Sequence, residues 1–417
     1  MVHNKFKYQC STCGSEYDAE EIIYLCPLCS QHQQTGEPPK GVLKVLYDYQ
    51  RLRSKKMDFR TLKINGFLDI LPIESLASLP NLKIGDTPLY IFEKLSGAKV
   101  PFTLFLKDDS QNPTFSFKDR ASALVSAFAK EKGLNTIVAA STGNAGSSLA
   151  GICAAQGQKA IIMVPETAPM AKLTQIMMYG ATIVPLKGSY DDAFDLSVAA
   201  TQEFGWYNRN TAYNPLTIEG KKTVAFELFE QLDHKTPDRI FVSVGDGVII
   251  AGVFKGFEDL MKLGFIDKMP CIVAVQAKGS DNLVRNLSHE HFEAKASNTI
   301  ADSISVDAPR NFHMARQFIK KYNGQGLTIS DEEILNAAST LAKQTGIFTE
   351  PASAAAYAGM LQYLKEQKID PDSTNVVMLT GSGLKDLKAI QEIVKISESV
   401  SPTIEKLKRH YNNFDVT

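Results

Sequence analysis

From Leu134 onward, short apolar runs alternate with longer segments that have the composition of helices. Glycines stand where the first three of these helices should end: Gly157, Gly180 and Gly205. The alternation resumes after Trp206, through the apolar runs DRIFVSVGDG, MPCIVAVQAKG and NVVMLTGSG. Short strands separated by helices of this length predict parallel sheets with right-handed crossovers. We therefore expect an α/β protein with two doubly wound parallel-sheet domains and a crevice between them.

The first 60 residues have a different pattern. Two CxxC pairs come first, and GVLKVLYDY then alternates like a strand. We expect residues 1–60 to form a small zinc-ribbon-like segment. Residues 61–133 and 211–417 should form a large domain, and residues 134–210 a small α/β domain.

Composition and charge exclude several classes of protein. The 417 residues are 44% hydrophobic with a formal net charge of −1, which argues against a disordered chain and against a basic nucleic-acid-binding surface. No apolar run is long enough to span a bilayer, and MVHNKFKYQC lacks the apolar core of a signal peptide. We therefore expect a cytoplasmic protein that acts on a small molecule and binds neither nucleic acid nor a membrane.

Three turns share one design, an apolar strand followed by small or polar residues and then a helix. They are STGNAG from Ser141, SVGDGVI from Ser243 and LTGSGLKD from Leu379. A helix N-terminus offers unpaired backbone N–H groups and the positive end of its dipole, which suits an anion. Tight packing of a strand on a helix also selects glycine, so one turn alone is weak evidence. Three such turns in one chain favour a site for phosphates or carboxylates.

Lys118 lies in NPTFSFKDR, at the expected start of an amphipathic helix. Most lysines at such positions are solvated. The flanking rings of Phe115 and Phe117 suggest another reading, because desolvation favours the neutral amine that can attack an aldehyde. The residues alone leave both readings open.

NPTFSFKDR resembles the cofactor-binding lysine segment of the threonine synthase family, in the tryptophan synthase β-subunit-like superfamily of pyridoxal-phosphate enzymes. NPLTIEGKKTVAFEL, GIFTEPASAAAYAG and NVVMLTGSGLKD resemble further segments of that family in the same order. The paired cysteines and LKVLYDY extend the resemblance over most of the chain.

The resemblance implies a role for each matching residue. Lys118 would form the internal aldimine with pyridoxal 5'-phosphate and then carry protons. Asn144 would lie beside the ring hydroxyl of the cofactor, and Thr380 would face its pyridine nitrogen. The loop for the cofactor phosphate would consist of Gly245, Asp246, Gly247, Val248 and Ile249. The loop for the substrate carboxylate would include Ser141, Thr142 and Ala145.

The chain departs from the family pattern at three positions. Phe115 stands where the family usually has glycine, Asp246 where asparagine is common and Ser382 where histidine is common. The bulk of Phe115 would either reshape the substrate pocket or point into the core of the lysine helix, and the sequence leaves both alternatives open. The carboxylate of Asp246 must turn away from the phosphate, be paired or be protonated.

The cysteines follow the pattern CxxC, twelve residues, CxxC. Tetrahedral Zn²⁺ needs four soft ligands, which two such pairs supply. We expect a structural zinc on Cys10, Cys13, Cys26 and Cys29. The alternative is a ribbon remnant without metal.

The resemblance implies a lyase of threonine biosynthesis that converts O-phospho-L-homoserine and water to L-threonine and phosphate. Candidate cations for the substrate phosphate are Lys221, Lys222 and Arg120, although Arg120 could instead be a structural partner of Asp119. A second hypothesis keeps the cofactor and changes the substrate, as in cysteate synthase or an ammonia-lyase. A third is a pseudoenzyme or zinc-ribbon binding protein. The sequence leaves open whether the protein forms a homodimer.

Overall fold

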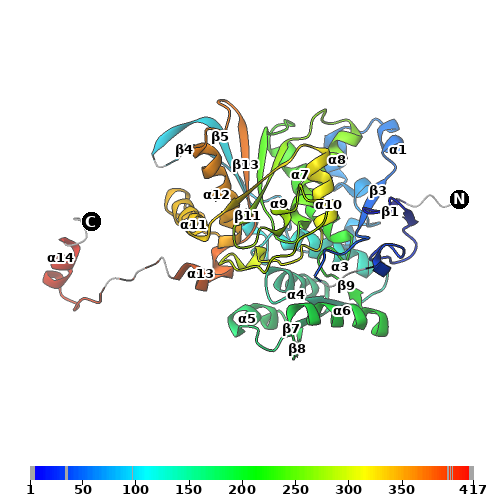
Figure 1. Ribbon diagram of the computed structural model, residues 1–417, viewed down its shortest axis with the longest axis horizontal. Coiled ribbons are helices and arrows are strands. Elements are labelled where there is room, and N and C mark those ends of the chain that lie inside the picture. The colour runs from blue at the N-terminus through cyan, green and yellow to red at the C-terminus, as the bar shows by residue number, and fades with distance from the viewer. Residues whose placement is uncertain are drawn as a thin grey trace.

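The computed structural model describes residues 5–32, 36–95, 97–391, 394, 396 and 398–412. Its strands form three sheets, a large one of six strands, a smaller one of four and an N-terminal one of three (Figure 1). In the part of the chain that is described, no helix is both long and apolar enough to cross a membrane.

The large sheet has the strand order β12-β11-β10-β13-β5-β4. These strands are β4 (Leu89–Leu95), β5 (Ala98–Asp108), β10 (Arg239–Ser243), β11 (Cys271–Ala277), β12 (Gln325–Ile329) and β13 (Thr374–Leu379). All neighbours pair in parallel except β4, which pairs antiparallel with β5 at the edge. The expected doubly wound parallel architecture is therefore confirmed, with one antiparallel edge strand.

Both faces of the large sheet are buried. Along β10, Val242 packs into one hydrophobic cluster and Phe241 into another, on the opposite face. The first face is covered by α3 (Lys118–Glu131), α7 (Leu216–Gln231), α8 (Val248–Leu263) and α10 (Phe312–Lys321). The second is covered by α11 (Asp331–Thr345), with the expected capping box of Ser330 and Glu333, and by α12 (Pro351–Lys365). Figure 1 shows α11 and α12 on the side away from α7 and α8.

The four-stranded sheet has the order β8-β7-β6-β9 and is parallel throughout. Its strands are β6 (Thr136–Ala140), β7 (Lys159–Pro165), β8 (Thr182–Leu186) and β9 (Tyr207–Asn208). Its helices are α4 (Asn144–Gln156), α5 (Met170–Met178) and α6 (Tyr190–Phe204). α4 and α6 end at Gly157 and Gly205 in the left-handed conformation, as expected. Because α4 packs against α3, the two larger sheets are joined beside Lys118.

Several short elements complete the chain. They are α1 (Tyr49–Ser54), α2 (Phe59–Ile64), α9 (Asn282–Arg285), α13 (Leu387–Gln391) and α14 (Ile404–Asn412). There are also short 3₁₀ turns, among them η5 (Asp302–Ile304) and η6 (Gly383–Lys385).

The turn after β13 differs from the sequence prediction. The chain enters η6, a single 3₁₀ turn of three residues, and not an α-helix. Backbone pairing with neighbouring segments keeps this turn extended. Gly381 forms a β-bridge with Ser116, and Ser382 forms one with Thr349. The side chain of Ser382 accepts a hydrogen bond from the backbone N–H of Leu384. LTGSGLKD is thus no helix-dipole anion site, and its role is to join the lysine segment to the start of α12.

The N-terminal sheet has the order β2-β1-β3 and is antiparallel. Its strands are β1 (Phe6–Cys10), β2 (Glu16–Asp18) and β3 (Leu43–Tyr47), the last of them the predicted strand in GVLKVLYDY. Two tyrosine hydroxyls, one at the end of β3 and one at the start of α1, contact the helices of the large domain. Tyr47 donates to Glu219 on α7 (2.7 Å), and Tyr49 donates to Asp259 on α8 (2.6 Å). The ribbon-like segment is therefore attached to helices that also border the candidate site.

We expect Tyr47→Phe to lower the free energy of unfolding by about 1–3 kcal/mol, because the fully buried Glu219 carboxylate would lose a donor. Urea denaturation at neutral pH measures the change. Tyr90→Phe is the matched control, since Tyr90 lies on the edge strand β4 and is 40% exposed. Equal unfolding curves for the two variants would contradict this account of the attachment.

Candidate active site

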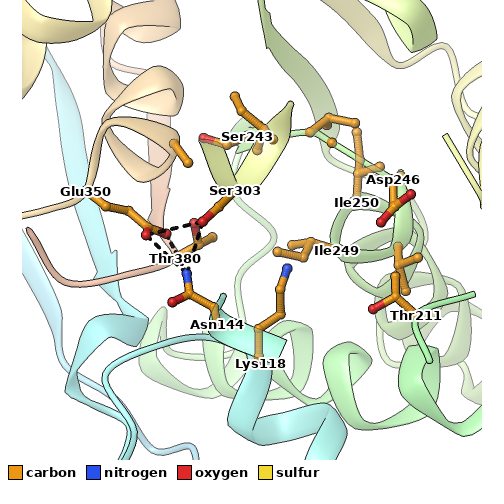
Figure 2. Close-up of a pocket in the computed structure, with 16 residues that line it drawn as sticks. Lys118, Asn144, Thr211, Ser243, Asp246, Ile249, Ile250, Ser303, Glu350 and Thr380 are labelled. Atoms are coloured by element: carbon orange, nitrogen blue, oxygen red, sulfur yellow. Dashed lines mark hydrogen bonds between the residues drawn. The ribbon is translucent and has the colours of Figure 1, made fainter. Parts of the chain in front are cut away.

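One pocket gathers residues from turns that are far apart in the sequence. Its lining includes all the residues expected to bind the cofactor: Lys118, Asn144, Gly245, Asp246, Gly247, Val248, Ile249 and Thr380. Figure 2 shows Lys118 near the middle, with Asn144 and Thr380 on one side and Thr211 and Asp246 on the other. The pocket lies where the ends of β6, β10 and β13 approach α3, as expected for parallel sheets.

Lys118 is the first residue of α3. Phe117 precedes it and is fully buried. Burial lowers the pKa of Lys118, and the nearby positive charge of Arg209 lowers this pKa further. Both effects favour the neutral amine, so the side chain suits attack on an aldehyde better than a surface lysine would.

Neither alternative for Phe115 holds in the structure. Its side chain is 45% exposed, so it does not lie in the core beside α3, and it does not line the pocket. Its backbone has φ 68°, in the left-handed region that favours glycine, which gives a physical reason for the glycine usual in the resembling family. Of the two rings, the buried Phe117 is therefore the one that shields the start of α3 from water.

The segment 245–249 forms a loop at the N-terminus of α8. Gly247 is the N-cap residue with φ 81°, and a β-carbon on Gly245 would lie 2.9 Å from the Cα of Ile304. Only glycine fits both positions without strain. The first N–H groups of α8 have no partner within the helix, so they can bind an anion.

Asp246 does not place a free carboxylate in this loop. Its Oδ1 accepts a hydrogen bond from the backbone N–H of Arg310 (3.1 Å), and its carbonyl accepts one from the N–H of Asn311 (2.9 Å). One carboxylate oxygen of Asp246 is therefore hydrogen-bonded to the backbone, and among the described residues Asp246 forms no salt bridge. Arg310 in turn contacts Asp191 at 2.5 Å.

At the other side of the pocket, Asn144 is held by a buried carboxylate. Its amide nitrogen donates to both carboxylate oxygens of Glu350, at 2.8 and 3.1 Å, and Ser303 completes the group (Figure 2). Burial raises the pKa of Glu350, although the hydrogen bond from Asn144 opposes this shift. The orientation of the Asn144 amide is thus fixed before any ligand enters.

Thr380 is fixed through its backbone. Its N–H donates to Ser353 Oγ (2.9 Å), and its carbonyl accepts from the N–H of Phe117 (2.9 Å). Its side chain lines the pocket, so a neutral hydroxyl is available to a ring nitrogen.

The residues present fit pyridoxal phosphate. A lysine with a lowered pKa can bond to the aldehyde, the glycine loop at a helix N-terminus suits the phosphate, and Thr380 offers a hydroxyl to the ring nitrogen.

A second cavity of about 250 Å³ adjoins the first and shares Asn144, Ser303 and Glu350 with it. Thr142 and Gly143 line this cavity beside the N-terminus of α4. Of the three residues expected at the substrate carboxylate, only Thr142 faces it. Within the described part of the chain, Ser141 and Ala145 line neither cavity, and the Ser141 hydroxyl accepts from the Gly143 N–H.

Lys385 forms one wall of this second cavity. Its Nζ donates to Ser147 Oγ (2.7 Å) and Gln175 Oε1 (2.5 Å). Burial lowers the pKa of Lys385 to about 8. The cavity thus joins a helix N-terminus to a lysine that keeps much of its charge near neutral pH, which suits a carboxylate.

Two of the three candidate cations for a substrate phosphate are used elsewhere. Lys222 lies 2.5 Å from Glu219 and 2.7 Å from Asp259, fully buried. The guanidinium of Arg120 is fully occupied by carboxylates on neighbouring elements. Its partners are Asp109 at 2.6 Å and Glu227 at 2.5 Å.

Asp119, the partner expected for Arg120, instead accepts from the backbone N–H of Thr114 (2.7 Å). Arg120 is therefore structural, as one of its two alternatives proposed, but its partners are Asp109 and Glu227 and not Asp119. Of the candidate cations, only Lys221 has no ion-pair partner among the described residues.

The four N-terminal cysteines converge on one point. The sulfur atoms of Cys10, Cys13, Cys26 and Cys29 all lie within 4.8 Å of one another. Two turns bring them together, one after β1 and one ahead of β3. Four thiols at this spacing have the geometry of a tetrahedral metal site.

Sequence reasoning missed several residues of the pocket, among them three polar ones. Ser303 and Thr211 have no local sequence signal, because their segments meet the pocket only through the tertiary fold. Glu350 lies in GIFTEPASAA, a segment recognised by its resemblance, where it precedes Pro351 at the start of α12. An acidic residue directly before such a helix was the signal that could have identified it.

Comparison with protein families gives the class to which this fold and site belong. The family described as "Pyridoxal-phosphate dependent enzyme" matches residues 81–381, most of the chain and all of the pocket residues. Solved structures with the same fold include threonine deaminase isoform 2 from Solanum lycopersicum (TM-score 0.66, 22% identity, 82% of this chain and 95% of that one). O-ureido-L-serine synthase is a second (TM-score 0.65, 20% identity, 76% of this chain and 95% of that one). Fold and site together define a pyridoxal-phosphate-dependent enzyme.

Proteins with similar sequences show which family of pyridoxal-phosphate-dependent enzymes the chain belongs to. The threonine synthase of Methanocaldococcus jannaschii is 36% identical over 400 residues, covering 93% of this chain and 96% of the relative. That of Methanosarcina acetivorans is 32% identical, covering 97% and 98%. That of Halalkalibacterium halodurans is 35% identical, covering 82% and 95%. The chain belongs to the threonine synthase family of pyridoxal-phosphate-dependent enzymes.

Proposed function

We propose that the protein is a lyase that converts O-phospho-L-homoserine and water to L-threonine and phosphate. The observation that carries this proposal is the similarity to threonine synthases over 93–97% of the chain, which extends through both larger sheets and the ribbon-like segment. The pocket supports it, because a lysine, a phosphate loop and an amide meet there in the arrangement that the family needs.

When bound, pyridoxal phosphate withdraws electrons from the substrate carbons next to its amino group. The residues of the chain would bind the cofactor, orient it and transfer the proton. Lys118 would hold the cofactor and remove the proton from the substrate Cα, a step that its lowered pKa favours. Segment 245–249 would hold the cofactor phosphate, Thr380 would face the ring nitrogen and Asn144 would lie beside the ring hydroxyl.

The second cavity would receive the substrate carboxylate. Thr142, Gly143 and the N-terminus of α4 would bind it, with Lys385 as a cation in the wall of the cavity. Ser141 and Ala145 would support the backbone of this loop without contacting the carboxylate. By holding the amide of Asn144, Glu350 would keep the shared wall of the two cavities in place.

Product analysis tests the proposal. Incubation with O-phospho-L-homoserine should release phosphate and L-threonine in equal amounts. Release of 2-oxobutanoate and ammonia with no L-threonine would identify an ammonia-lyase of the same fold and overturn the proposal.

We propose further that Cys10, Cys13, Cys26 and Cys29 bind a structural Zn²⁺. Metal analysis should give about one zinc per chain, and chelation should lower the melting temperature, because metal binding and folding are coupled in such sites. Cys13→Ser should lose the metal. Cys271→Ser, in which the altered thiol lies on β11 of the large sheet, should keep it. A metal-free protein with an unchanged melting temperature would show that the ribbon holds without zinc.

We also propose a domain division, a cellular location and an oligomeric state for the protein. We propose the domain division 1–60, 134–210 and 61–133 with 211–417, which agrees with where the three sheets lie in the chain. A cytoplasmic location and a homodimer are also proposed, and sedimentation of the purified protein tests the homodimer.

A further inference from the structure

Two buried cations beside the pocket lack an acidic partner. Arg209 and Lys221 are both fully buried. Among the described residues, neither takes part in a salt bridge, and Lys221 Nζ and Arg209 Nη2 have no hydrogen-bond partner. Burial of an unpaired charge is costly, so buried cations are normally paired. These two are therefore candidates for binding an anion.

Arg209 directly follows β9 of the four-stranded sheet and lies next to the pocket without itself lining it. Its Nε donates to Ser122 Oγ (3.1 Å), and its Nη1 donates to Thr211 Oγ1 (3.2 Å). Thr211 lines the pocket on the side of Asp246 (Figure 2). Two of the guanidinium nitrogens are thus anchored, which leaves Nη2 free to bind a ligand.

Lys221 lies on α7, next to the pocket without lining it. Helices α7 and α8 are so close there that a β-carbon on Gly252 would lie 2.7 Å from Lys221 Cβ. Gly252 is one turn after the start of α8, so Lys221 packs against the first turns of the helix that follows the loop 245–249. Burial holds the pKa of Lys221 well below its usual value, and the positive charges of Lys118 and Arg209 lower this pKa further. The three basic groups therefore lie close enough to repel one another.

The site has enough positive groups to bind two phosphates, and one phosphate would not use them all. The neutral N–H groups at the N-terminus of α8 suit one phosphate, that of the cofactor. Asp246 is the nearby carboxylate, and its Oδ1 is already bonded to the Arg310 N–H. The two cations are then available for a second dianion, and a guanidinium with a free nitrogen beside an ammonium forms short charge-assisted bonds to phosphate oxygens.

We propose that Arg209 and Lys221 bind the leaving phosphate of the substrate. This inference rests on the proposed function, in which the substrate is a phosphate monoester. In that role the pair orients the departing group beside Lys118 and stabilises its charge as the carbon–oxygen bond breaks. The cofactor phosphate is the alternative ligand for the pair, and the experiment separates the two.

The test uses the cofactor-loaded protein, so that the cofactor phosphate already occupies its loop, and inorganic phosphate as the probe. Lys221→Met keeps the length of the side chain and removes an amine that has no hydrogen-bond partner in the described part of the chain. We expect the variant to melt higher than the wild type without phosphate, because a buried polar group without a partner is gone. We expect its Kd for phosphate to rise at least about tenfold, with cofactor content unchanged.

Lys222→Met is the matched control. This neighbouring lysine is also fully buried but is paired with Glu219 and Asp259. The control should melt lower than the wild type and keep the wild-type affinity for phosphate. Opposite shifts in melting temperature for adjacent lysines distinguish a ligand-binding role from a structural one.

Three results would overturn the inference. They are no binding of inorganic phosphate by the wild type, an unchanged Kd in Lys221→Met, or loss of cofactor from that variant with phosphate binding intact. A different result would show that the proposed function, and not this inference, is wrong. If phosphate binding depends on Lys221 while O-phospho-L-homoserine is not converted, the anion subsite stands and the substrate assignment falls.

Discussion

Lys118→Ala should lower kcat for O-phospho-L-homoserine by about a thousandfold or more, because one side chain both holds the cofactor and moves the substrate proton. Few other changes to the pocket should have so large an effect. The reason lies in the position of Lys118 at the start of α3, behind the buried ring of Phe117, where its pKa is lowered.

Borohydride reduction of the cofactor-loaded protein, followed by peptide mapping, measures the attachment directly. The pyridoxyl label should appear on Lys118 and be absent in the variant. Lys130→Ala is the matched control, since Lys130 lies at the exposed end of the same helix. It should keep wild-type activity and labelling. A label on any lysine other than Lys118 would refute the assignment.

Arg120→Met should lower the free energy of unfolding by about 3–5 kcal/mol, because it leaves the buried carboxylate of Asp109 and the partly buried carboxylate of Glu227 without their guanidinium. Burial opposes ionisation of Glu227, but the charges of Arg120 and Lys107 outweigh it and hold the pKa of Glu227 well below its usual value. A carboxylate with a depressed folded-state pKa stabilises the fold above its unfolded pKa and loses that contribution as the pH falls. Denaturation at pH 7 therefore reports the full effect.

Arg51→Met is the control for this network, because Arg51 lies on the exposed side of the short helix α1. It should change the unfolding curve little. A small effect of Arg120→Met at pH 7 would mean that water enters and solvates Asp109 and Glu227.

Local sequence patterns were enough to predict the scaffold. The alternation of strand and helix gave the parallel sheets, and SVGDGVI was correctly expected to lead from a strand into a helix, because glycine at position 247 meets a local backbone requirement. Resemblance then added the residues that line the pocket, including Asn144 and Thr380. These features depend on short segments, so they can be recognised without the tertiary fold.

Features that depend on distant contacts could not be predicted in this way. Arg120 was considered as a structural partner of Asp119, but its partners Asp109 and Glu227 come from other elements. The sequence left the position of Phe115 open, and the structure gives it a left-handed backbone and an exposed ring. Arg209 lies about 90 residues from Lys118 in the chain, and only the packing of α3, β9 and α7 brings the two charges together.

The specificity of the enzyme is the central claim, and steady-state kinetics with two substrates tests it most directly. O-phospho-L-serine is one methylene shorter than O-phospho-L-homoserine, and a methylene alone changes binding by about 1–3 kcal/mol. The shorter substrate would also misplace its leaving phosphate, with loss of charge-assisted bonds and of geometry. We predict a kcat/KM for O-phospho-L-homoserine with water that exceeds the value for O-phospho-L-serine with sulfite by more than a methylene explains. A higher kcat/KM for O-phospho-L-serine with sulfite would contradict the threonine synthase assignment and favour a cysteate synthase.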